Sequence, residues 1–435
     1  MILFRAFAWP AVLGGMICAL SWLWAAPALR AEVHQVAPPG STAPDGAWAS
    51  LAALLAADVV AGGDDIALLA GNHGDIALKG LRFDRPVTIR PAPGARARLT
   101  GLVISQSRNL IFEGLQVWPD SMGTGKDGHL IRTTPDTRAI VFRNLDVRGR
   151  ADAARYRNWS RQTWLAADRA GILLRGPASA VLGSRFTGLS GGLGITGDGA
   201  RIEGNVIRGF GNDGIQITAD NVVVRGNQIE DCVKVDDNHD DGIQAWSLGP
   251  EGKPGRGTVK NLKVQNNIIL EWRGRQAPAL VCDLQGIGLF DGTYTGLEIT
   301  NNLVMVSAYH GISVYGGIDS VIANNTVLHR TRAGADRPWI GVFTHKDGRP
   351  SRRMVVANNL APKFAIARES GALTTRQNMT ERYPARQMVA PYEGDFTPRA
   401  DSGMMDTGAR THAPARDLFG RLRGAAPDVG AIERP

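Results

Sequence analysis

Short runs of apolar residues, each followed by a Gly-Asn or Asn-Asn pair and a second apolar pair, recur along the chain. Clear copies occupy residues 200–207 (ARIEGNVI), 221–229 (NVVVRGNQI), 261–269 (NLKVQNNII), 296–304 (GLEITNNLV), 320–327 (SVIANNTV) and 353–360 (RMVVANNL), with weaker copies at 109–117 and 139–147. A repeat of this kind, with a spacing that varies, indicates a solenoid whose coils carry insertions in their loops. The pattern therefore predicts stacked short strands.

The second residue of each pair defines a column of asparagines. Its members are Asn144, Asn205, Asn227, Asn267, Asn302, Asn325 and Asn359. Asparagines stacked on rungs about 4.7–4.8 Å apart form ladders of side-chain amides. A second register repeats Gly-Ile at residues 171–172, 194–195, 214–215, 242–243, 286–287 and 311–312, where the isoleucine is expected to fill the interior. Together the two registers predict an all-β fold, a right-handed parallel β-helix.

The ends of the chain differ from this repeat. Residues 1–31 are predicted to be a signal peptide, because Arg5 precedes an apolar run and small residues follow it. Residues 32–64 are expected to carry a capping helix at 45–61, and residues 65–362 the β-helix. Residues 363–435, where the asparagine repeat stops, are expected to form an irregular capping tail.

Composition supports a folded, exported protein. With 53 Gly, 43% hydrophobic residues and no Gly-X-Y period, the chain is neither collagen-like nor disordered. Removal of residues 1–31 lowers the formal charge from +8 to +6, and a basic exported protein suits a polyanionic glycan. No nucleic acid or nucleotide partner is predicted. The location is periplasmic or extracellular, with a membrane contact only if the N-terminal segment stays uncleaved; Cys232 and Cys282 are free to pair there.

Polar and charged residues lie in one outward column of the predicted β-helix. The residues immediately before the Gly-Ile pairs are Ala170, Leu193, Asp213, Asp241, Gln285 and His310. Gln216 and Gln244 follow on the same strand face. Carboxylates on adjacent rungs have coupled ionisation, and such like charges are costly unless a proton, a cation or a substrate uses them. This column is the candidate site.

The segment before Asp241 is the densest polar stretch of the chain. It contains Lys234, Asp236, Asp237, Asn238, His239 and Asp240. Three interpretations remain open: a solvated turn with Asx hydrogen bonds, a Ca²⁺ site at Asp236 and Asp237, or a part of a catalytic site.

Two families resemble these motifs. The series at 212–215 (NDGI), 240–243 (DDGI) and 309–313 (YHGIS) resembles that of polygalacturonase-type glycoside hydrolases, although the usual Thr between Asn and Asp is missing. The resemblance implies a pectin-lyase-like β-helix, Asp240 as the general acid, Asp213 and Asp241 as activators of water, and His310 in support. Inverting hydrolysis needs its acid and base about 6.5–9.5 Å apart.

The segment 237–240 (DNHD) is similar to the Asp-Pro-His-Asp/Glu motif of mannuronan C5-epimerases, with the Pro replaced. That resemblance implies a proton transfer at C5 of a uronate by His239. The same proton abstraction followed by elimination defines a polysaccharide lyase, for which Lys234 is a second candidate base.

Further residues are expected to bind the substrate. Arg157 and Trp159 lie in an insertion rich in Arg and aromatic residues, and Trp246 lies in a later loop. Rings stack on sugars, and Arg binds carboxylates. The hypotheses are therefore a secreted glycosidase that hydrolyses a uronate-containing polysaccharide, a lyase or C5-epimerase, and a non-catalytic glycan-binding β-helix. The fold alone does not select among them.

Overall fold

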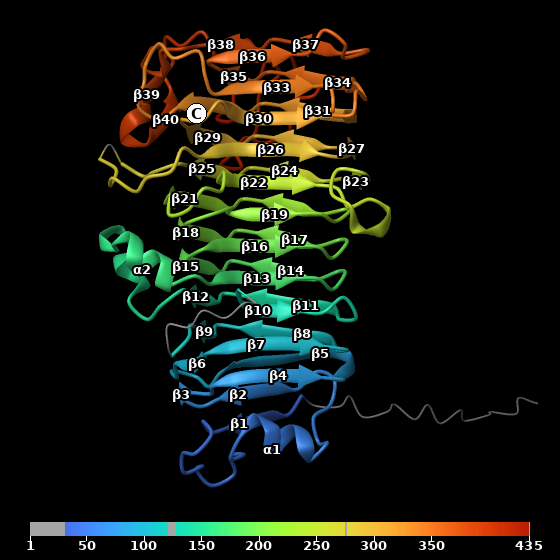
Figure 1. Ribbon diagram of the computed structural model, residues 1–435, viewed down its shortest axis with the longest axis vertical. Coiled ribbons are helices and arrows are strands. Elements are labelled where there is room, and N and C mark those ends of the chain that lie inside the picture. The colour runs from blue at the N-terminus through green and yellow to red at the C-terminus, as the bar shows by residue number, and fades with distance from the viewer. Residues whose placement is uncertain (1–30, 121–127, 275, 435) are drawn as a thin grey trace, which may run out of the picture.

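Stacked coils of three parallel strands form the body of the molecule. The computed structural model describes residues 31–120, 128–274 and 276–434. Within them the strands form three long parallel sheets of 11, 12 and 15 strands and a separate two-stranded sheet. Figure 1 shows the coils rising in chain order from β1 at one end to β38 at the other. The predicted right-handed parallel β-helix is confirmed.

The eleven-stranded sheet carries the Gly-Ile register. Its strands are β4 (Asp75–Lys79), β7 (Gly101–Ser105), β10 (His129–Thr133), β13 (Ala170–Leu174), β16 (Gly191–Ile195), β19 (Ile215–Ile217), β22 (Asp241–Trp246), β26 (Gln285–Asp291), β30 (His310–Tyr315), β33 (Trp339–Phe343) and β36 (Lys363–Ile366).

The twelve-stranded sheet follows the asparagine pairs. Its strands are β3 (Gly71–Asn72), β6 (Ala97–Leu99), β9 (Gln116–Val117), β12 (Asp146–Arg148), β15 (Arg185–Leu189), β18 (Val206–Phe210), β21 (Gln228–Cys232), β25 (Ile268–Leu270), β29 (Leu303–Val306), β32 (Thr326–His329), β35 (Leu360–Ala361) and β38 (Met379–Thr380).

The fifteen-stranded sheet precedes the asparagine pairs. Its strands are β1 (Val33–Val36), β2 (Asp65–Leu68), β5 (Arg82–Pro91), β8 (Arg108–Glu113), β11 (Arg138–Arg143), β14 (Ala180–Leu182), β17 (Arg201–Glu203), β20 (Val223–Arg225), β23 (Thr258–Lys260), β24 (Lys263–Gln265), β27 (Thr293–Thr295), β28 (Glu298–Thr300), β31 (Gly317–Ala323), β34 (Arg352–Ala357) and β37 (Thr374–Arg376).

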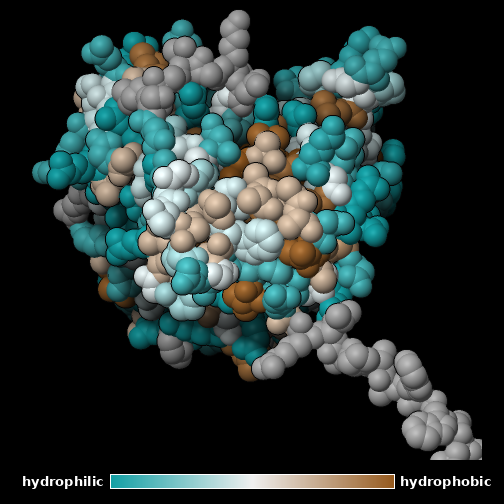
Figure 2. Space-filling model, turned by 90° about the horizontal axis from the view of Figure 1, so that it is seen from below, coloured by the Kyte–Doolittle hydropathy of each residue, from teal (hydrophilic) through white to brown (hydrophobic). Residues whose placement is uncertain are grey.

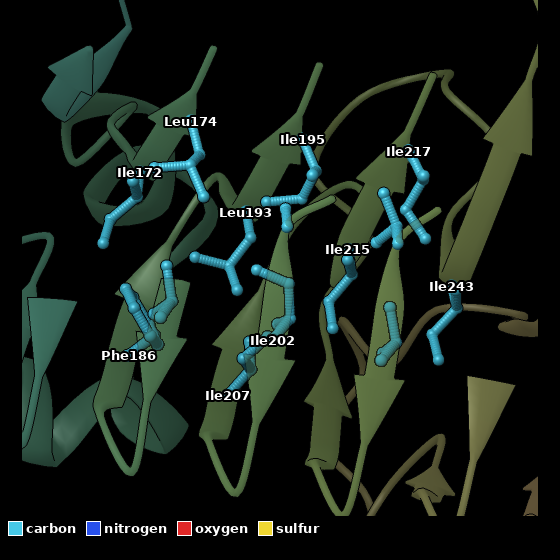
Figure 3. Packing of buried hydrophobic residues seen from close by; sticks show 14 of the residues in the cluster. Ile172, Leu174, Phe186, Leu193, Ile195, Ile202, Ile207, Ile215, Ile217 and Ile243 are labelled. Carbon is cyan, nitrogen blue, oxygen red and sulfur yellow. The ribbon is translucent and has the colours of Figure 1, made fainter. Parts of the chain in front are cut away.

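Aliphatic stacks fill the interior. Ile172, Leu193, Ile215 and Ile243 are register partners on successive strands and are buried, as Figure 3 shows. Leu193 thus belongs to the interior stack, and the expectation that it faces outward with Asp213 is wrong. Ile195 pairs with Ile217 and not with Ile215, so the Gly-Ile pair of this coil lies two residues later in the register, and Gly191 aligns with Asp213.

The glycines before Ile215 and Ile243 are required by a close approach between coils. A Cβ built on Gly214 would lie 2.6 Å from the carbonyl oxygen of Gly242, and one on Gly242 would lie 2.9 Å from that of Gly286. Real Cβ atoms do not approach carbonyl oxygens so closely. The Asp-Gly-Ile sequence therefore places a carboxylate directly beside a tightly stacked backbone.

A continuous asparagine ladder holds the corner between the fifteen- and twelve-stranded sheets. In each step the Oδ1 of one asparagine accepts from both the backbone N–H and the Nδ2 of the preceding one, at 2.9–3.0 Å. The members are Asn205, Asn227, Asn267, Asn302, Asn325, Asn359 and Asn378. The ladder pairs otherwise unsatisfied buried backbone groups from coil to coil.

Two expectations about this ladder are corrected. Asn144 is the first residue of its pair, with φ 56°, and the buried Leu145 occupies the ladder position instead. The repeat also continues past residue 362, because Asn378 and the strands β36 to β38 complete a further coil. The N–H of Leu145 is satisfied by Ser184 Oγ, at 3.0 Å.

The ends are capped in different ways. The predicted helix at 45–61 is reduced to α1 (Leu51–Ala56), which begins after Ser50, whose Oγ accepts from Ala53 N. Leu51 and Leu54 cover the core, and Figure 2 shows paler and brown residues gathered at the middle of this end. The tail holds β39 (Met388–Ala390), β40 (Asp395–Pro398), η3 (Pro384–Arg386) and η4 (Pro391–Glu393).

Insertions supply the remaining elements. They are η1 (Ala153–Asn158), α2 (Arg161–Ala166) and η2 (Pro250–Gly252). No helix among the described residues is long and apolar enough to cross a membrane. The predicted signal peptide lies almost entirely outside the described residues.

One disulfide joins two neighbouring coils. Cys232, at the end of β21, bonds to Cys282, 50 residues later, with a Cα–Cα distance of 5.5 Å. The pairing left open by the sequence is thus present. Both half-cystines are buried.

The ladder predicts a specific loss of stability. Asn267→Ala leaves the buried N–H of Asn227 without its acceptor and removes one of the two donors to Oδ1 of Asn302, which we expect to lower the free energy of unfolding by about 2–4 kcal/mol. Urea unfolding followed by circular dichroism measures this change. Lys260→Ala, at an exposed position on a neighbouring strand, is the control; equal midpoints for the two variants would contradict the structural role of the ladder.

Candidate functional site

The coils bring two carboxylates and a histidine together on the outer face of the eleven-stranded sheet. Ile215 pairs with Ile243 in register, so Asp213 and Asp241 stand on adjacent rungs of one column. The backbone N–H of Asp241 donates to Oδ1 of Asp213 at 2.9 Å. The predicted adjacency of these two acids is confirmed.

Both carboxylates are almost fully buried, and each is hydrogen-bonded by a glutamine on its own strand. Gln216 Nε2 donates to Oδ2 of Asp213, and Gln244 Nε2 donates to Oδ2 of Asp241 at 3.1 Å. Burial, together with the charge of Asp241, raises the pKa of Asp213 to about 7, and burial also raises the pKa of Asp241. A carboxyl group that is protonated near neutral pH can donate as well as accept a proton.

His239 reaches this pair from the loop before β22. Its Nδ1 lies 2.9 Å from Oδ2 of Asp241, and its side chain is 63% exposed whereas that of Asp241 is 0% exposed. The hydrogen bond to Asp241 raises the pKa of His239. When Nδ1–H donates to Asp241, Nε2 carries the lone pair and can act as a base toward a molecule in solution.

A pocket of about 400 Å³ opens over these groups. Its polar lining comes from Asn212, Asp213, Gln216, Asn238, His239, Gln244 and Asp291. Trp246, Phe290 and Pro254 supply apolar walls. Gly288 makes room for Phe290, because a Cβ on Gly288 would lie 2.2 Å from the ring. Polar groups converging in a partly apolar hollow are typical of a ligand site.

The hollow continues along the sheet toward the N-terminal coils. A smaller depression shares Asn212, Asp213 and Gln216 with the pocket and runs over Gly191 and Gly194 to His129. From His129 it passes into a third hollow that is lined by Arg132 and Arg169. The described residues therefore form a groove across several rungs, with acids near its middle, small residues next and basic residues at its N-terminal end.

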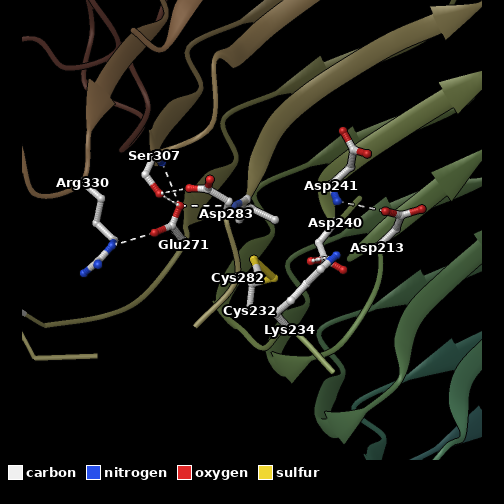
Figure 4. Close-up of a disulfide and its surroundings, with 11 residues drawn as sticks. Asp213, Cys232, Lys234, Asp240, Asp241, Glu271, Cys282, Asp283, Ser307 and Arg330 are labelled. Atoms are coloured by element: carbon white, nitrogen blue, oxygen red, sulfur yellow. Dashed lines mark hydrogen bonds and ion pairs between the residues drawn. A yellow bond between two sulfur atoms is a disulfide. The ribbon is translucent and has the colours of Figure 1, made fainter. Parts of the chain in front are cut away.

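Asp240 faces away from the groove. It is 2% exposed, and its Oδ2 lies 3.3 Å from Nζ of Lys234 beside the Cys232–Cys282 disulfide, on the other side of the strand from Asp241 (Figure 4). Burial raises its pKa to about 7. Neither Asp240 nor Lys234 lines the pocket, which contradicts their assignment as general acid and base in contact with substrate. Strand alternation sends neighbouring side chains in opposite directions.

His310 lies in the predicted column but outside the pocket. Gln285 occupies the rung between Asp241 and His310. His310 is 6% exposed, contacts Ser313 Oγ through Nδ1 at 2.7 Å, and packs among Phe290, Tyr309 and Trp339. Burial lowers its pKa to about 4. The intervening rung separates this histidine from the acids.

Arg157 and Trp159 do not reach the groove. Arg157 pairs with the buried Asp231 and lies over the ring of Trp272, next to the twelve-stranded sheet. Trp159 is 8% exposed and packs edge to face against Trp164. Their insertion folds over its own aromatic cluster, so the assignment of these two residues to the groove is contradicted. Trp246, Gln216 and Gln244 do line the pocket.

The acidic loop shows no assembled metal site. Asp236 accepts from the backbone N–H of Asn238 at 3.0 Å, and both Asp236 and Asp237 are exposed. Among the described residues, the one grouping of three or more potential His, Cys, Asp or Glu ligands is Cys232, Asp240 and Cys282. Its two sulfurs are bonded to each other, so it does not offer a thiolate site. The Ca²⁺ prediction at Asp236 and Asp237 has no support from this geometry.

Several groove residues were missed by the sequence analysis. His129 precedes Ile131 by two residues, which is the spacing between Asp213 and Ile215, but Leu130 replaces the glycine. Phe290 and Asp291 follow the Gly-Ile pair of their coil, where a register shift re-aims the strand end. The spacing before Ile131 could have identified His129 from the sequence. The positions of Phe290 and Asp291 depend on an irregularity of the strand, which the sequence does not show.

Comparisons with known proteins agree with the fold. A family model described as "Right handed beta helix region" matches residues 163–327. This match lies within the coils of the β-helix that the structure shows. A comparison with curated proteins found no match.

Solved structures with a similar fold include a pectate lyase (14% identity, TM-score 0.45, covering 93% of this chain and 96% of that one). Others are a PL6 family polysaccharide lyase from Pseudopedobacter saltans (11%, 0.44, 92% and 99%) and the A-module of a mannuronan C-5 epimerase from Azotobacter vinelandii (13%, 0.43, 76% and 94%). Similarity at this level does not identify a substrate or a reaction.

The raised pKa of Asp213 predicts a pH-dependent stability. The folded chain retains a proton that the unfolded chain releases, so the contribution of this group to stability falls as the pH rises from about 4 to about 7. Asp213→Asn keeps Oδ1 for Asp241 N–H and removes the titration. We expect the Tm difference, variant minus wild type, to be more positive at about pH 8 than at about pH 5.

Thermal unfolding at both pH values checks this expectation, with the exposed Asp237→Asn as the matched control. A Tm difference for Asp213→Asn that does not change with pH would show that this carboxyl is ionised throughout.

Proposed function

We propose that the protein acts on a uronate-containing polysaccharide by removing the proton at C5, as a polysaccharide lyase. The observation that carries this proposal is the exposed imidazole of His239 held by the buried Asp241 on the wall of a groove. A base oriented by a buried carboxylate is a recurrent arrangement for proton abstraction. A glycan suits the groove because strand rungs about 4.8 Å apart offer regularly repeated contacts.

The proposed elimination removes the proton at C5 and breaks the C4–O4 bond. His239 Nε2 takes the C5 proton, the electron pair forms the C4–C5 double bond, and the C4–O4 bond breaks as O4 leaves. O4 takes a proton from a water molecule and becomes the new end of the departing fragment, and the protonated His239 returns its proton to the hydroxide that is left. Negative charge develops on the uronate carboxylate, where the protonated form of Asp213 and the side-chain amide of Asn212 are placed to donate hydrogen bonds.

The carboxylate geometry favours elimination over inverting hydrolysis. Asp213 and Asp241 stand in one column and share a hydrogen bond, so they do not flank a sugar from two sides. Asp291, which also lines the pocket, pairs with Lys346 and lies five strand positions from the column of acids, about 16 Å along the strand. An acid and a base for inversion lie about 6.5–9.5 Å apart.

Export from the cytoplasm forms part of the proposal. The apolar N-terminal segment is typical of a signal peptide, and the Cys232–Cys282 disulfide is stable in an oxidising compartment. A periplasmic or extracellular location would give the protein access to glycans. Detection of the protein in a periplasmic fraction, with its N-terminus at or near residue 32, would test the location.

Substitution of the proposed base tests the reaction. We expect His239→Gln to lower kcat at least about 100-fold, and Asp241→Asn to have a similar effect, because both remove the oriented base. The assay follows the ultraviolet absorbance of the unsaturated product on polygalacturonate, alginate and glucuronan. His310→Gln, a change of the same kind outside the pocket, is expected to retain activity.

Other results of these assays would contradict the assignment as a lyase. New reducing ends without ultraviolet absorbance would establish hydrolysis instead. Altered C5 configuration without cleavage, detected by NMR, would establish epimerisation. Inactivity on all the acidic polysaccharides, or equal losses in the two histidine variants, would refute the assignment of this site.

The arginines at the basic end of the groove predict an effect on substrate binding that leaves the rate of the chemical step unchanged. Arg132→Ala removes a cation that is placed to meet a uronate carboxylate, so we expect the KM for polymer to rise about tenfold with kcat unchanged. Arg201→Ala, on the fifteen-stranded sheet, is the control. An unchanged KM would place the substrate elsewhere along the sheet.

A further inference from the structure

A surface of aromatic rings lies on the eleven-stranded sheet, on the C-terminal side of the pocket. Phe290, Tyr315 and Phe343 occupy equivalent outward positions near the ends of β26, β30 and β33, since each follows an interior residue of one register stack. Tyr309 directly precedes β30, and Trp339 begins β33. Figure 1 shows these three strands stacked in chain order beyond β22. We call these five residues the aromatic platform.

The rings of the platform form one continuous series of contacts. The centroids of Phe290 and Tyr315 are 5.8 Å apart, and those of Tyr315 and Phe343 are 4.7 Å apart. From Phe343 the series continues to Trp339 at 6.2 Å and from there to Tyr309 at 5.1 Å. Four of the rings are partly exposed, and Tyr309 is 44% exposed. The platform is therefore accessible from solvent.

Glycines allow two of these rings to lie against the sheet. A Cβ on Gly288 would lie 2.2 Å from the ring of Phe290, and a Cβ on Gly341 would lie 2.2 Å from the ring of Phe343. Both glycines belong to the outward column that carries Gln216 and Gln244 in the pocket. The polar side chains of this column thus give way to aromatic rings, beginning on the rung after Gln244.

The platform begins beside the proposed base. Phe290 lines the pocket, and its ring centroid lies 6.5 Å from that of His239, in an edge-to-face arrangement. A polysaccharide whose reacting uronate lies at His239 extends along the coils in both directions. Toward the N-terminus it follows the groove, and toward the C-terminus it meets the platform. Rungs about 4.8 Å apart repeat the aromatic contact from β26 to β33.

The platform is uncharged, which distinguishes it from the pocket. The face of an aromatic ring is negative, so it attracts C–H groups and cations and disfavours a carboxylate. Lys363 already lies over the ring of Trp339, with Nζ 5.6 Å from its centroid. His310 is buried among the rings, out of reach of a ligand, and burial lowers its pKa to about 4, so it adds no charge at neutral pH. The C–H faces of neutral sugars fit this surface.

We propose that the aromatic platform binds uncharged sugars of the same polysaccharide, so that the substrate is a glycan in which neutral sugars neighbour the uronate, and not a polyuronate. This role of the platform rests on the proposed occupation of the groove by a uronate-containing polysaccharide. It adds the substrate class, because the pocket receives the uronate and the platform receives its neutral neighbours.

Isothermal titration calorimetry of the full-length His239→Gln chain tests the substrate class without turnover. The probes are oligosaccharides of equal length: oligoglucuronate, hyaluronan, in which glucuronate alternates with neutral N-acetylglucosamine, and deacylated gellan, in which glucuronate is joined to neutral glucose and rhamnose. We expect the mixed oligosaccharides to bind at least about tenfold more tightly than oligoglucuronate. Oligoglucuronate that binds as tightly as both mixed probes would overturn the proposal.

Substitutions in the same chain test the platform itself. Tyr309→Ala removes the most exposed ring and should weaken binding of the mixed probes about tenfold, with little effect on oligoglucuronate. Tyr315→Ala, nearer the pocket, should act in the same way. Tyr309→Phe keeps the ring and should retain the affinity, as should Phe419→Ala, at a phenylalanine of the tail that is 57% exposed. The Tm of each variant shows whether a loss of binding comes from unfolding.

Failure of the platform and failure of the lyase assignment are distinguishable. If both alanine variants bind the mixed probes as His239→Gln does, or if none of the probes binds, the platform has no role in binding, whatever the wild-type chain does to polyuronates. If the mixed probes bind through the platform and the wild-type chain forms no unsaturated product from them, the platform is confirmed and the elimination is refuted.

Discussion

The asparagine ladder is the constraint on which the rest of the structure depends. Each buried amide satisfies a backbone N–H and a side chain of the preceding coil, so neighbouring coils are aligned to within one residue. A slip of one residue would leave those groups unpaired in the interior and would turn the interior isoleucines outward. Insertions between coils can therefore be long without disturbing the stack. That register brings Asp213 and Asp241, 28 residues apart, to within a hydrogen bond.

The groove derives its chemistry from the same stacking. Coils packed so closely leave little water beside Asp213 and Asp241, and burial raises the pKa of both carboxyls. A protonated acid and an exposed histidine then occur together at neutral pH, a combination that two solvated residues would not provide. Burial of these two carboxyl groups destabilises the fold locally, as is common at functional sites.

Polar groups are hydrogen-bonded differently on the two sides of the solenoid. On the eleven-stranded sheet, Oδ2 of Asp213 and Oδ2 of Asp241 are hydrogen-bonded beside an open groove, while the buried Oδ1 of Asp241 has no partner. Beside the twelve-stranded sheet, Glu271 and Asp231 are saturated by arginines and backbone N–H groups, while donors of Trp272, Arg330 and Tyr392 remain unpaired. The first arrangement suits proton transfer.

The repeat by itself determined the fold, the asparagine ladder from Asn205 onward and the adjacency of Asp213 and Asp241, because coil register follows directly from local sequence spacing. It misplaced Asn144 and Leu193, where a coil departs from the spacing by one or two residues. Only the tertiary structure decided that Asp240 turns toward Lys234, that Arg157 folds back on Asp231, and that Phe290 joins the pocket. Those positions depend on strand alternation, insertions and a register shift, and contacts between distant segments set all three.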